Sequence, residues 1–287
     1  DVAIGQRPSM SDEQVEMVRA YVRRGGGLVA TCETSLCDER GRSRGDFALK
    51  DLFGTSYRGR PVPGPAKREL DANFALVIND QYWAQRGQAG AFRFSDQADS
   101  IFATDPRLKA VLPNLQGTFK GPLVRPADFQ PPMKPALMYF PEGSREPFVV
   151  AATGDHGAGR VVYLAAGVDA AMFNYAFPYQ RVMLTRAIQW AARTPPLLEV
   201  RAPMCVQSTF WRQGPRTIVH LWNGLNTTSG HGLPEVESPL REETVPVHGI
   251  ELRLRGVPFK TARAEPEGIL RGARKLSVFA ANDDAHR

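Results

Sequence analysis

Residues 11–31, SDEQVEMVRAYVRRGGGLVAT, predict a helix, a glycine turn and a buried strand in that order. Ser11 stands three residues before Gln14, a spacing typical of a capping box, in which each side chain bonds the other residue's backbone N–H. The apolar residues recur at helical spacing: Val15, Val18 and Val22. Gly25 supplies the left-handed stop, and residues 28–31 (LVAT) follow as a short strand. A helix and a strand joined in this way predict an α/β fold with a sheet that is mainly parallel.

Only five residues, DVAIG, precede the residues that lead into this helix, too few for the strand and loop of a full crossover. They also lack an initiator Met and the basic and apolar regions of a signal peptide. We therefore expect the natural N-terminus to lie upstream. Residues 28–31 should then lie beside an unfilled or borrowed position of the sheet, and the open edge should favour association.

Farther along, residues 148–152 and 160–164 are β-rich, and the glycine-containing stretch 154–157 between them predicts a hairpin turn there. Pro178 begins another helix, whose apolar face is formed by Leu184, Ala187, Ile188 and Ala191. Of the intervening sequence, residues 32–68 are predicted to be irregular, residues 73–79 to form a buried segment, and residues 87–134 give no clear periodicity. These elements predict an α/β domain over residues 1–195.

The sequence Thr194-Pro195-Pro196 predicts a domain boundary, because its prolines end the preceding helix and stiffen the exit. Downstream, the apolar periodicity changes from helical to alternating. Four short strands are predicted, around residues 206–211, 217–222, 245–254 and 275–279, with a turn at Gly214-Pro215. Residues 196–287 are therefore predicted to form a small antiparallel, sandwich-like β-domain.

Composition argues against several classes of function. The net charge of +6 is spread over both halves without an aromatic, arginine-rich binding motif, so we expect no nucleic-acid partner. No apolar run reaches the ~20 residues that span a bilayer, so we expect no membrane partner. The three cysteines and five histidines show no metal-ligand spacing, and neither a metal nor another cofactor is expected. So few cysteines favour a reducing, cytoplasmic compartment.

Three groups of segments together resemble one family. They are residues 11–31 with ETSL (33–36) and GDFAL (45–49), GRVVY (159–163) with IQWA (188–191), and RTIVHLWN (216–223). The first two are similar to the type 1 glutamine-amidotransferase-like domain known as the β-galactosidase trimerisation domain. The third resembles a strand of the small β-domain that follows it in family-42-like glycoside hydrolases.

This resemblance implies a flavodoxin-like, doubly wound sheet with a structural role. Such a domain packs against a catalytic barrel upstream in the parent protein and builds a homo-oligomer. The catalytic carboxylates of the family belong to that barrel, and none can be carried onto this chain. Glu142 and Glu146 lie among Pro141, Gly143 and Pro147 and are interpreted as loop surface, not as a catalytic pair. The predicted function is the non-catalytic, oligomerising portion of a β-galactosidase-like enzyme.

Cys32 raises an alternative, because a working amidotransferase places its nucleophilic cysteine directly after a strand. The sharp turn usually has glycine two positions before and after the cysteine, where this chain has Ala30 and Thr34. The later His-x-Glu pair is also missing, since His156 precedes Gly157-Ala158 and is interpreted as a turn residue. Cys32 is therefore predicted to be a buried, inert thiol. A free-standing hydrolase that uses Cys32 is the alternative function.

Two further sets of residues are candidates for binding. The charged residues of the loop after the first strand are interpreted as a salt-bridged interface: Glu33, Asp38, Arg40, Arg42, Arg44 and Asp46. Trp211 and Trp222 lie on the two sides of the predicted turn in the β-domain and are candidates to stack on sugar rings, which would make the chain a carbohydrate-binding module. The competing interpretation places one or both indoles in the core of that domain.

Overall fold

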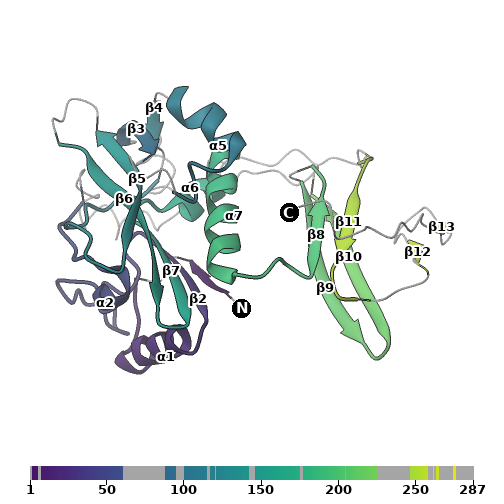
Figure 1. Ribbon diagram of the computed structural model, residues 1–287, viewed down its shortest axis with the longest axis horizontal. Coiled ribbons are helices and arrows are strands. Elements are labelled where there is room, and N and C mark those ends of the chain that lie inside the picture. The colour runs from purple at the N-terminus through teal and green to yellow at the C-terminus, as the bar shows by residue number, and fades with distance from the viewer. Residues whose placement is uncertain are drawn as a thin grey trace, which may run out of the picture. The chain divides into compact units, whose positions relative to one another are not determined.

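The computed structural model describes residues 2–5, 8–60, 88–94, 100–114, 117–119, 121–141, 146–174, 177–203, 205–224, 246–257, 261, 263–264 and 274–275 (Figure 1). These residues form two compact units, one up to Pro195 and one from Pro196 onward. The predicted buried segment 73–79 and Glu142 lie outside the described residues.

A seven-stranded mixed sheet forms the centre of the first unit. Its strands are β1 (Val2–Gly5), β2 (Gly27–Thr31), β3 (Gln88–Phe94), β4 (Gly117–Phe119), β5 (Lys134–Pro141), β6 (Phe148–His156) and β7 (Gly159–Leu164), in the order β1-β2-β7-β6-β5-β3-β4. Only β1, β2 and β7 are parallel to one another, and every other neighbouring pair is antiparallel. The prediction of a mainly parallel sheet was therefore wrong. Strands joined by tight turns, such as β6 and β7, must run in opposite directions.

The helices in the described part of this unit are α1 (Asp12–Arg23), α2 (Lys50–Phe53), α5 (Pro106–Val111), α6 (Val168–Asn174) and α7 (Pro178–Ala192), with a 3₁₀ turn, η1 (Leu112–Asn114). The capping box of α1 is confirmed. Ser11 N–H donates to Gln14 Oε1 (3.0 Å), and Gln14 N–H donates to Ser11 Oγ (3.2 Å). Val15 and Val22 are buried as predicted, and Gly25 follows the helix with φ +104°. None of the described helices is long and apolar enough to cross a membrane.

Helices cover both faces of the parallel strands (Figure 1). Gly27 lies against α7, where an added Cβ would stand 2.5 Å from the Ala191 carbonyl oxygen. Gly159 lies against the end of α1, where an added Cβ would stand 2.1 Å from the Val22 carbonyl oxygen. Gly27 pairs with Arg160, the neighbour of Gly159, and neighbouring strand residues point to opposite faces. The first unit is therefore layered, with α1 on one side of the sheet and α7 on the other.

The position beside β2 is filled. β1 pairs with β2 in parallel along its whole length, from Val2 opposite Gly27 to Gly5 opposite Ala30. The prediction that residues 28–31 border an unfilled or borrowed position was wrong, because the short sequence VAIG is sufficient for a four-residue strand. Among the described strands, β1 lies at this edge of the sheet.

The β6–β7 hairpin is confirmed, but its turn is shorter than predicted. β6 continues through Gly154 to His156, which pairs with Gly159, so the turn consists of Gly157 and Ala158. His156 is a strand residue and not the predicted turn residue. Gly154 does not turn the chain. It makes room for Met133, whose sulfur would stand 2.6 Å from an added Cβ.

An aromatic cluster fills the α1 side of the sheet. Tyr163 of β7 stacks on Phe53 with ring centroids 4.5 Å apart and meets the edge of Phe47 at 5.5 Å. All three rings are fully buried. Phe47 and Phe53 belong to the predicted irregular region, which is confirmed apart from α2 for the described residues up to position 60. This region is thus held to the sheet by aromatic packing.

The second unit contains three antiparallel strand pairs in its described residues. The pairs are β8 (Leu198–Arg201) with β11 (Glu251–Leu254), β9 (Val206–Gln213) with β10 (Arg216–Asn223), and β12 (Arg263–Ala264) with β13 (Arg274–Lys275). The β9–β10 hairpin and its Gly214-Pro215 turn are confirmed. The predicted strand 245–254 is shorter, because residues 246–250 are irregular, and residues 276–279 lie outside the described part. Each side chain of this unit for which burial is described is exposed or half-buried.

Candidate functional site

The sharp turn after β2 is the candidate site of the first unit. Cys32 follows the strand directly and has φ +47°, a left-handed conformation that only a few per cent of non-glycine residues adopt. Its backbone N–H donates to the Leu164 carbonyl (2.7 Å), and its carbonyl accepts from the Tyr163 hydroxyl (2.7 Å). Ala30 and Thr34 stand where the strand-to-helix turn of an amidotransferase usually has glycine, and no helix follows Cys32 within residues 32–49. Tertiary hydrogen bonds hold the left-handed turn without the flanking glycines.

The Cys32 thiol is not placed to act as a nucleophile. The residue is fully buried, and burial, together with the nearby Glu33 carboxylate, raises the pKa of the thiol well above its usual range. Only the thiolate attacks a substrate. His156 lies at the opposite end of the sheet, since it pairs with Gly159 whereas Cys32 follows Thr31, the partner of Leu164. That separation is roughly 20 Å of strand, far beyond hydrogen-bond reach.

Glu33 and Arg60 form a clamp beside this turn. Arg60 Nε and Nη2 donate to the two carboxylate oxygens of Glu33, each at 2.6 Å. The Glu33 side chain is 12% exposed and the Arg60 side chain 32%, so the pair is partly withdrawn from water. The side-chain hydrogen bond to Glu33 raises the pKa of Arg60 above its ordinary value. Glu33 thus bonds within its own chain. Nothing in the sequence indicated that Arg60, 27 residues farther along the chain, would be the partner of Glu33.

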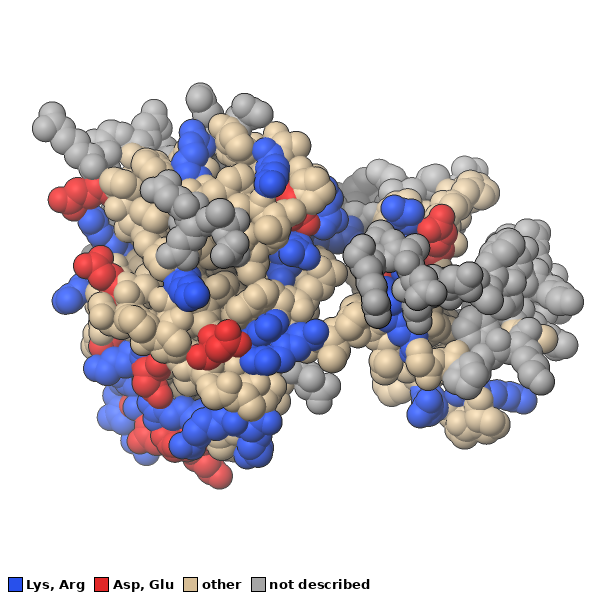
Figure 2. Space-filling model, viewed as in Figure 1, with Lys and Arg blue, Asp and Glu red and all other residues tan. Residues whose placement is uncertain are grey.

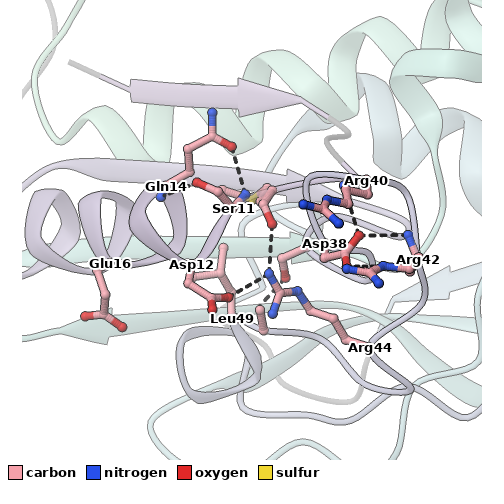
Figure 3. Close-up of polar contacts among 12 residues, drawn as sticks. Ser11, Asp12, Gln14, Glu16, Asp38, Arg40, Arg42, Arg44 and Leu49 are labelled. Carbon is pink, nitrogen blue, oxygen red and sulfur yellow. Dashed lines mark hydrogen bonds and ion pairs between the residues drawn. The ribbon is translucent and has the colours of Figure 1, made fainter.

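The candidate interface loop bonds mainly to itself and to α1 (Figure 3). Asp38 Oδ1 accepts from the backbone N–H of Arg40 and of Arg42, each at 2.9 Å, and the Arg42 side chain closes the same turn at 2.8 Å. The backbone N–H of Arg42 is the main reason that the pKa of Asp38 is lowered. Arg44 pairs with Asp12 of α1 at 2.7 Å. The side chains of Arg40 and Arg42 remain exposed at the tip.

Asp46 organises the next stretch of the loop. Its Oδ1 accepts from the backbone N–H of Phe47 and of Tyr57, each at 2.8 Å, and its Oδ2 lies 3.3 Å from Lys50 Nζ. Burial acts to raise the pKa of Asp46, but the two backbone donors hold it below its ordinary value. Among the six predicted interface residues, the structure therefore places Glu33 and Asp46 in internal contacts and leaves Arg40 and Arg42 at the surface.

The two candidate tryptophans are both at the surface of the second unit. Trp211 is 59% exposed and Trp222 is 55% exposed, which contradicts the competing interpretation that one or both belong to the core. Trp211 pairs with Ile218 and Trp222 with Gln207 across the β9–β10 hairpin. Because directly opposed residues share a face and the side-chain period is two, both indoles lie on the same face.

The other charged side chains and the possible metal ligands are scattered and form no further candidate site in the described residues. On the face of the first unit seen in Figure 2, Lys and Arg side chains lie among Asp and Glu and form no continuous patch of one sign. Within the described ranges, no group of three or more His, Cys, Asp and Glu side chains is arranged to hold a metal ion.

His156 provides a prediction about pH. Burial against α2 lowers the pKa of its imidazole below the ordinary 6.5, although the Asp51 carboxylate and the Leu52 backbone act in the opposite direction. The unfolded chain therefore binds the proton more readily, so stability is present above pH 6.5 and decreases as the pH falls below it. Between pH 7.5 and 5.5, we expect His156→Gln to reduce this loss by about 1 kcal/mol or less.

The measurement is urea denaturation of both chains at several pH values. His248→Gln is the matched control, because His248 is exposed and lies in the second unit. It should leave the pH dependence as in the parent chain. Equal slopes for the parent and His156→Gln would contradict the prediction.

The fold is similar to part of several glycoside hydrolases of known structure. The α-L-fucosidase isoenzyme 2 from Paenibacillus thiaminolyticus matches 91% of this chain and 35% of its own length, with a TM-score of 0.53 and 14% identity. A β-galactosidase from Bacillus circulans sp. alkalophilus matches 78% of this chain and 27% of its own, with a TM-score of 0.51 and 14% identity. For a β-galactosidase from Rahnella sp. R3 the coverages are the same, with a TM-score of 0.50 and 12% identity.

No protein-family model matches the sequence, and no curated protein matches it. At 12–14% identity, the structural likeness concerns the fold alone. The chain spans 27–35% of the length of these enzymes. In fold, it is therefore similar to a minor portion of larger glycoside hydrolases.

Proposed function

We propose that this chain is the non-catalytic structural and oligomerising portion of a β-galactosidase-like glycoside hydrolase, whose catalytic barrel lies upstream in the parent protein. The observation that carries the proposal is the closed turn at Cys32. This position, at the carboxyl end of a parallel strand, is where α/β folds place their ligands and nucleophiles. Here it holds a fully buried thiol of raised pKa, and His156, the described histidine of the first unit, lies at the opposite end of the sheet.

The first unit is proposed to be a flavodoxin-like domain of the amidotransferase and trimerisation type. The β1-α1-β2 crossover, the parallel partner β7 and the helices on both faces support this assignment. The left-handed turn at Cys32 supports it further, because amidotransferases carry their nucleophile on such a turn. The Glu33–Arg60 clamp and the Tyr163 hydroxyl occupy the surroundings of the thiol with structural contacts. These contacts support a domain with an amidotransferase-like fold and a structural role.

Two surfaces of the first unit support the oligomerising role. β1 is the edge of the described sheet, and an edge strand presents backbone N–H and C=O groups with which another chain can pair. The loop tip with Arg40 and Arg42 presents two guanidinium groups on a backbone that Asp38 holds in place. A rigid, charged tip of this kind suits pairing with carboxylates of a second copy or of the barrel. The second unit is proposed to complete a small sandwich-like domain.

The first test is enzymatic. The purified 287-residue chain should hydrolyse neither aryl glycosides nor glutamine, and iodoacetamide should modify the half-buried Cys37 and Cys205 before Cys32, as read by mass spectrometry. Turnover that disappears in Cys32→Ala and persists in Cys37→Ala would overturn the proposal. It would support the hydrolase alternative instead.

The second test concerns assembly. Sedimentation velocity over a tenfold range around micromolar concentration should show association of the chain. Reversing the loop charges with Arg40→Glu and Arg42→Glu should weaken it by about tenfold or more. Lys109→Glu with Arg181→Glu is the matched control, because both residues are exposed cations on other elements. A monomer at every concentration, with a cooperative melt, would refute the oligomerising role.

A further inference from the structure

One face of the β9–β10 hairpin carries two aromatic platforms separated by polar groups. The antiparallel register sets the residues of this face in four opposed pairs. From the base of the hairpin to its tip they are Gln207 with Trp222, Thr209 with His220, Trp211 with Ile218, and Gln213 with Arg216. Apart from the half-buried Ile218, every member is exposed. The face is thus open along the hairpin, which Figure 1 shows as a twisted pair of arrows.

The polar groups at the centre of this face are ordered by one another. Trp211 Nε1–H donates to Thr209 Oγ1 at 3.2 Å, and the same oxygen lies 3.2 Å from His220 Nδ1. The hydrogen bond orients the Trp211 ring on the strand, so less side-chain entropy is lost when a ligand stacks on it. His220 Nε2 and the two glutamine amides supply donors and acceptors on either side.

The spacing of the two indoles favours an extended ligand. Trp222 lies opposite Gln207, and Gln207 is four residues from Trp211 along β9. Four strand residues correspond to about 13 Å, and the two tryptophans stand on different strands, so the line between them runs diagonally over the Thr209–His220 pair. A ligand that reaches both rings must be longer than one sugar ring and must present polar groups between two stacking units.

We infer that this face binds a neutral oligosaccharide chain of several sugar units, with Trp211 and Trp222 as stacking platforms. The C–H face of a pyranose ring is apolar and packs on an indole, whereas its hydroxyl groups both donate and accept hydrogen bonds. The described face matches this chemistry with two exposed indoles and a set of uncharged amide, hydroxyl and imidazole groups. This site is additional to the structural role proposed above.

The low charge and the interrupted apolar surface of this face favour a neutral sugar over a nucleic acid or a protein partner. Arg216, at the tip, is the one permanently charged residue among the eight, so a nucleic acid would find a single cation where phosphate binding needs several. A protein partner would require a contiguous apolar centre. Here the Thr209–His220 pair interrupts the apolar surface between the two indoles. Neutral sugars are the ligands that such alternation suits best.

The test uses the whole 287-residue chain and an array of neutral oligosaccharides that includes β-linked galactans, glucans, mannans and xylans. Hits are measured by titration calorimetry. Trp211→Ala and Trp222→Ala should each weaken binding by about tenfold, and the double variant should lose it. Arg212→Ala and Leu221→Ala are the matched controls. Each is adjacent to one tryptophan but points to the opposite face of the hairpin, and should bind as the parent chain does.

Circular dichroism on melting shows that each variant is folded. Four results would overturn the inference. They are no binding across the array, sugar binding that survives the double variant, tighter binding to a uridine homopolymer than to any glycan, and a change of oligomeric state caused by the tryptophan variants. The last would identify the face as a contact between copies. A failure to bind sugars would leave the Arg40 and Arg42 assembly test unaffected.

Discussion

Gly159→Ala is expected to destabilise the first unit by about 3 kcal/mol, because the new methyl group has no room. An added Cβ would lie 2.1 Å from the Val22 carbonyl oxygen and 2.6 Å from that of Gly26. Both are backbone atoms, one in the last turn of α1 and one in the connection to β2, so they can move only if this backbone shifts away from β7. Urea denaturation followed by circular dichroism measures the loss.

Gly157→Ala is the matched control, two residues earlier in the turn that leads into β7. Gly157 has φ +62°, but an added Cβ would meet nothing within 4 Å. The substitution should therefore cost only the left-handed conformation, about 1 kcal/mol. Equal losses at positions 157 and 159 would contradict the close packing of α1 on the start of β7.

Tyr163→Ala should have the largest effect of any single truncation at the candidate site, about 4 kcal/mol. The side chain is fully buried, stacks on Phe53, meets Phe47 edge to face, and donates its hydroxyl to the Cys32 carbonyl. The substitution would leave a cavity between the sheet and the loop region. It would also remove the donor that holds the left-handed turn. Urea denaturation again gives the loss.

Tyr163→Phe separates the ring from the hydroxyl. It keeps the packing and removes only the hydrogen bond to the Cys32 carbonyl, so it should cost about 1–2 kcal/mol. Alkylation of Cys32 by iodoacetamide should also become faster than in the parent chain, because the turn that buries the thiol is less restrained. A Tyr163→Phe chain with unchanged stability and unchanged Cys32 protection would show that the hydroxyl does not hold the turn.

These two sites explain how the fold and the closed turn depend on each other. Gly159 lets α1 approach the beginning of β7, and Tyr163 anchors the loop region near its end. The Cys32 turn is in a conformation that costs about 1–3 kcal/mol in a non-glycine residue and persists only where the surroundings determine it. Hydrogen bonds with the adjacent residues Tyr163 and Leu164 of β7 hold the turn in this conformation without a catalytic partner. This arrangement favours a structural role for the turn.

Several elements could be predicted from the sequence because their causes are local. The capping box joins residues three positions apart, and the Gly25 stop depends on its own backbone. The β9–β10 hairpin follows from alternation and a Gly-Pro turn, and its register then sets which side chains share a face. The same locality explains why β6 and β7 were recognised, although not where their turn begins.

Other elements escaped prediction because their stability comes from partners far along the chain. β3, α5, η1 and β4 occupy residues 87–134, where the sequence shows no clear periodicity, and β5 was also missed. β3 and β5 are interior strands of the sheet and are specified by their neighbours as much as by their own residues. The short β1 escaped for the same reason, since four residues become a strand only beside β2.

The sequence by itself determined the class of the first unit, the ends of α1, the start of α7 and the two hairpins, because capping, proline geometry and alternation act over a few residues. Only the tertiary structure decided the closure of the candidate site. The Tyr163 hydroxyl reaches Cys32 from 131 residues away, and Arg60 reaches Glu33 from 27 residues away. Contacts between residues so far apart in the sequence form only when the fold brings their segments together, so no local pattern predicts them. The buried position of Cys32 was predicted from the sequence, but the contacts that close its turn and the exposure of Trp211 and Trp222 were decided only by the tertiary structure.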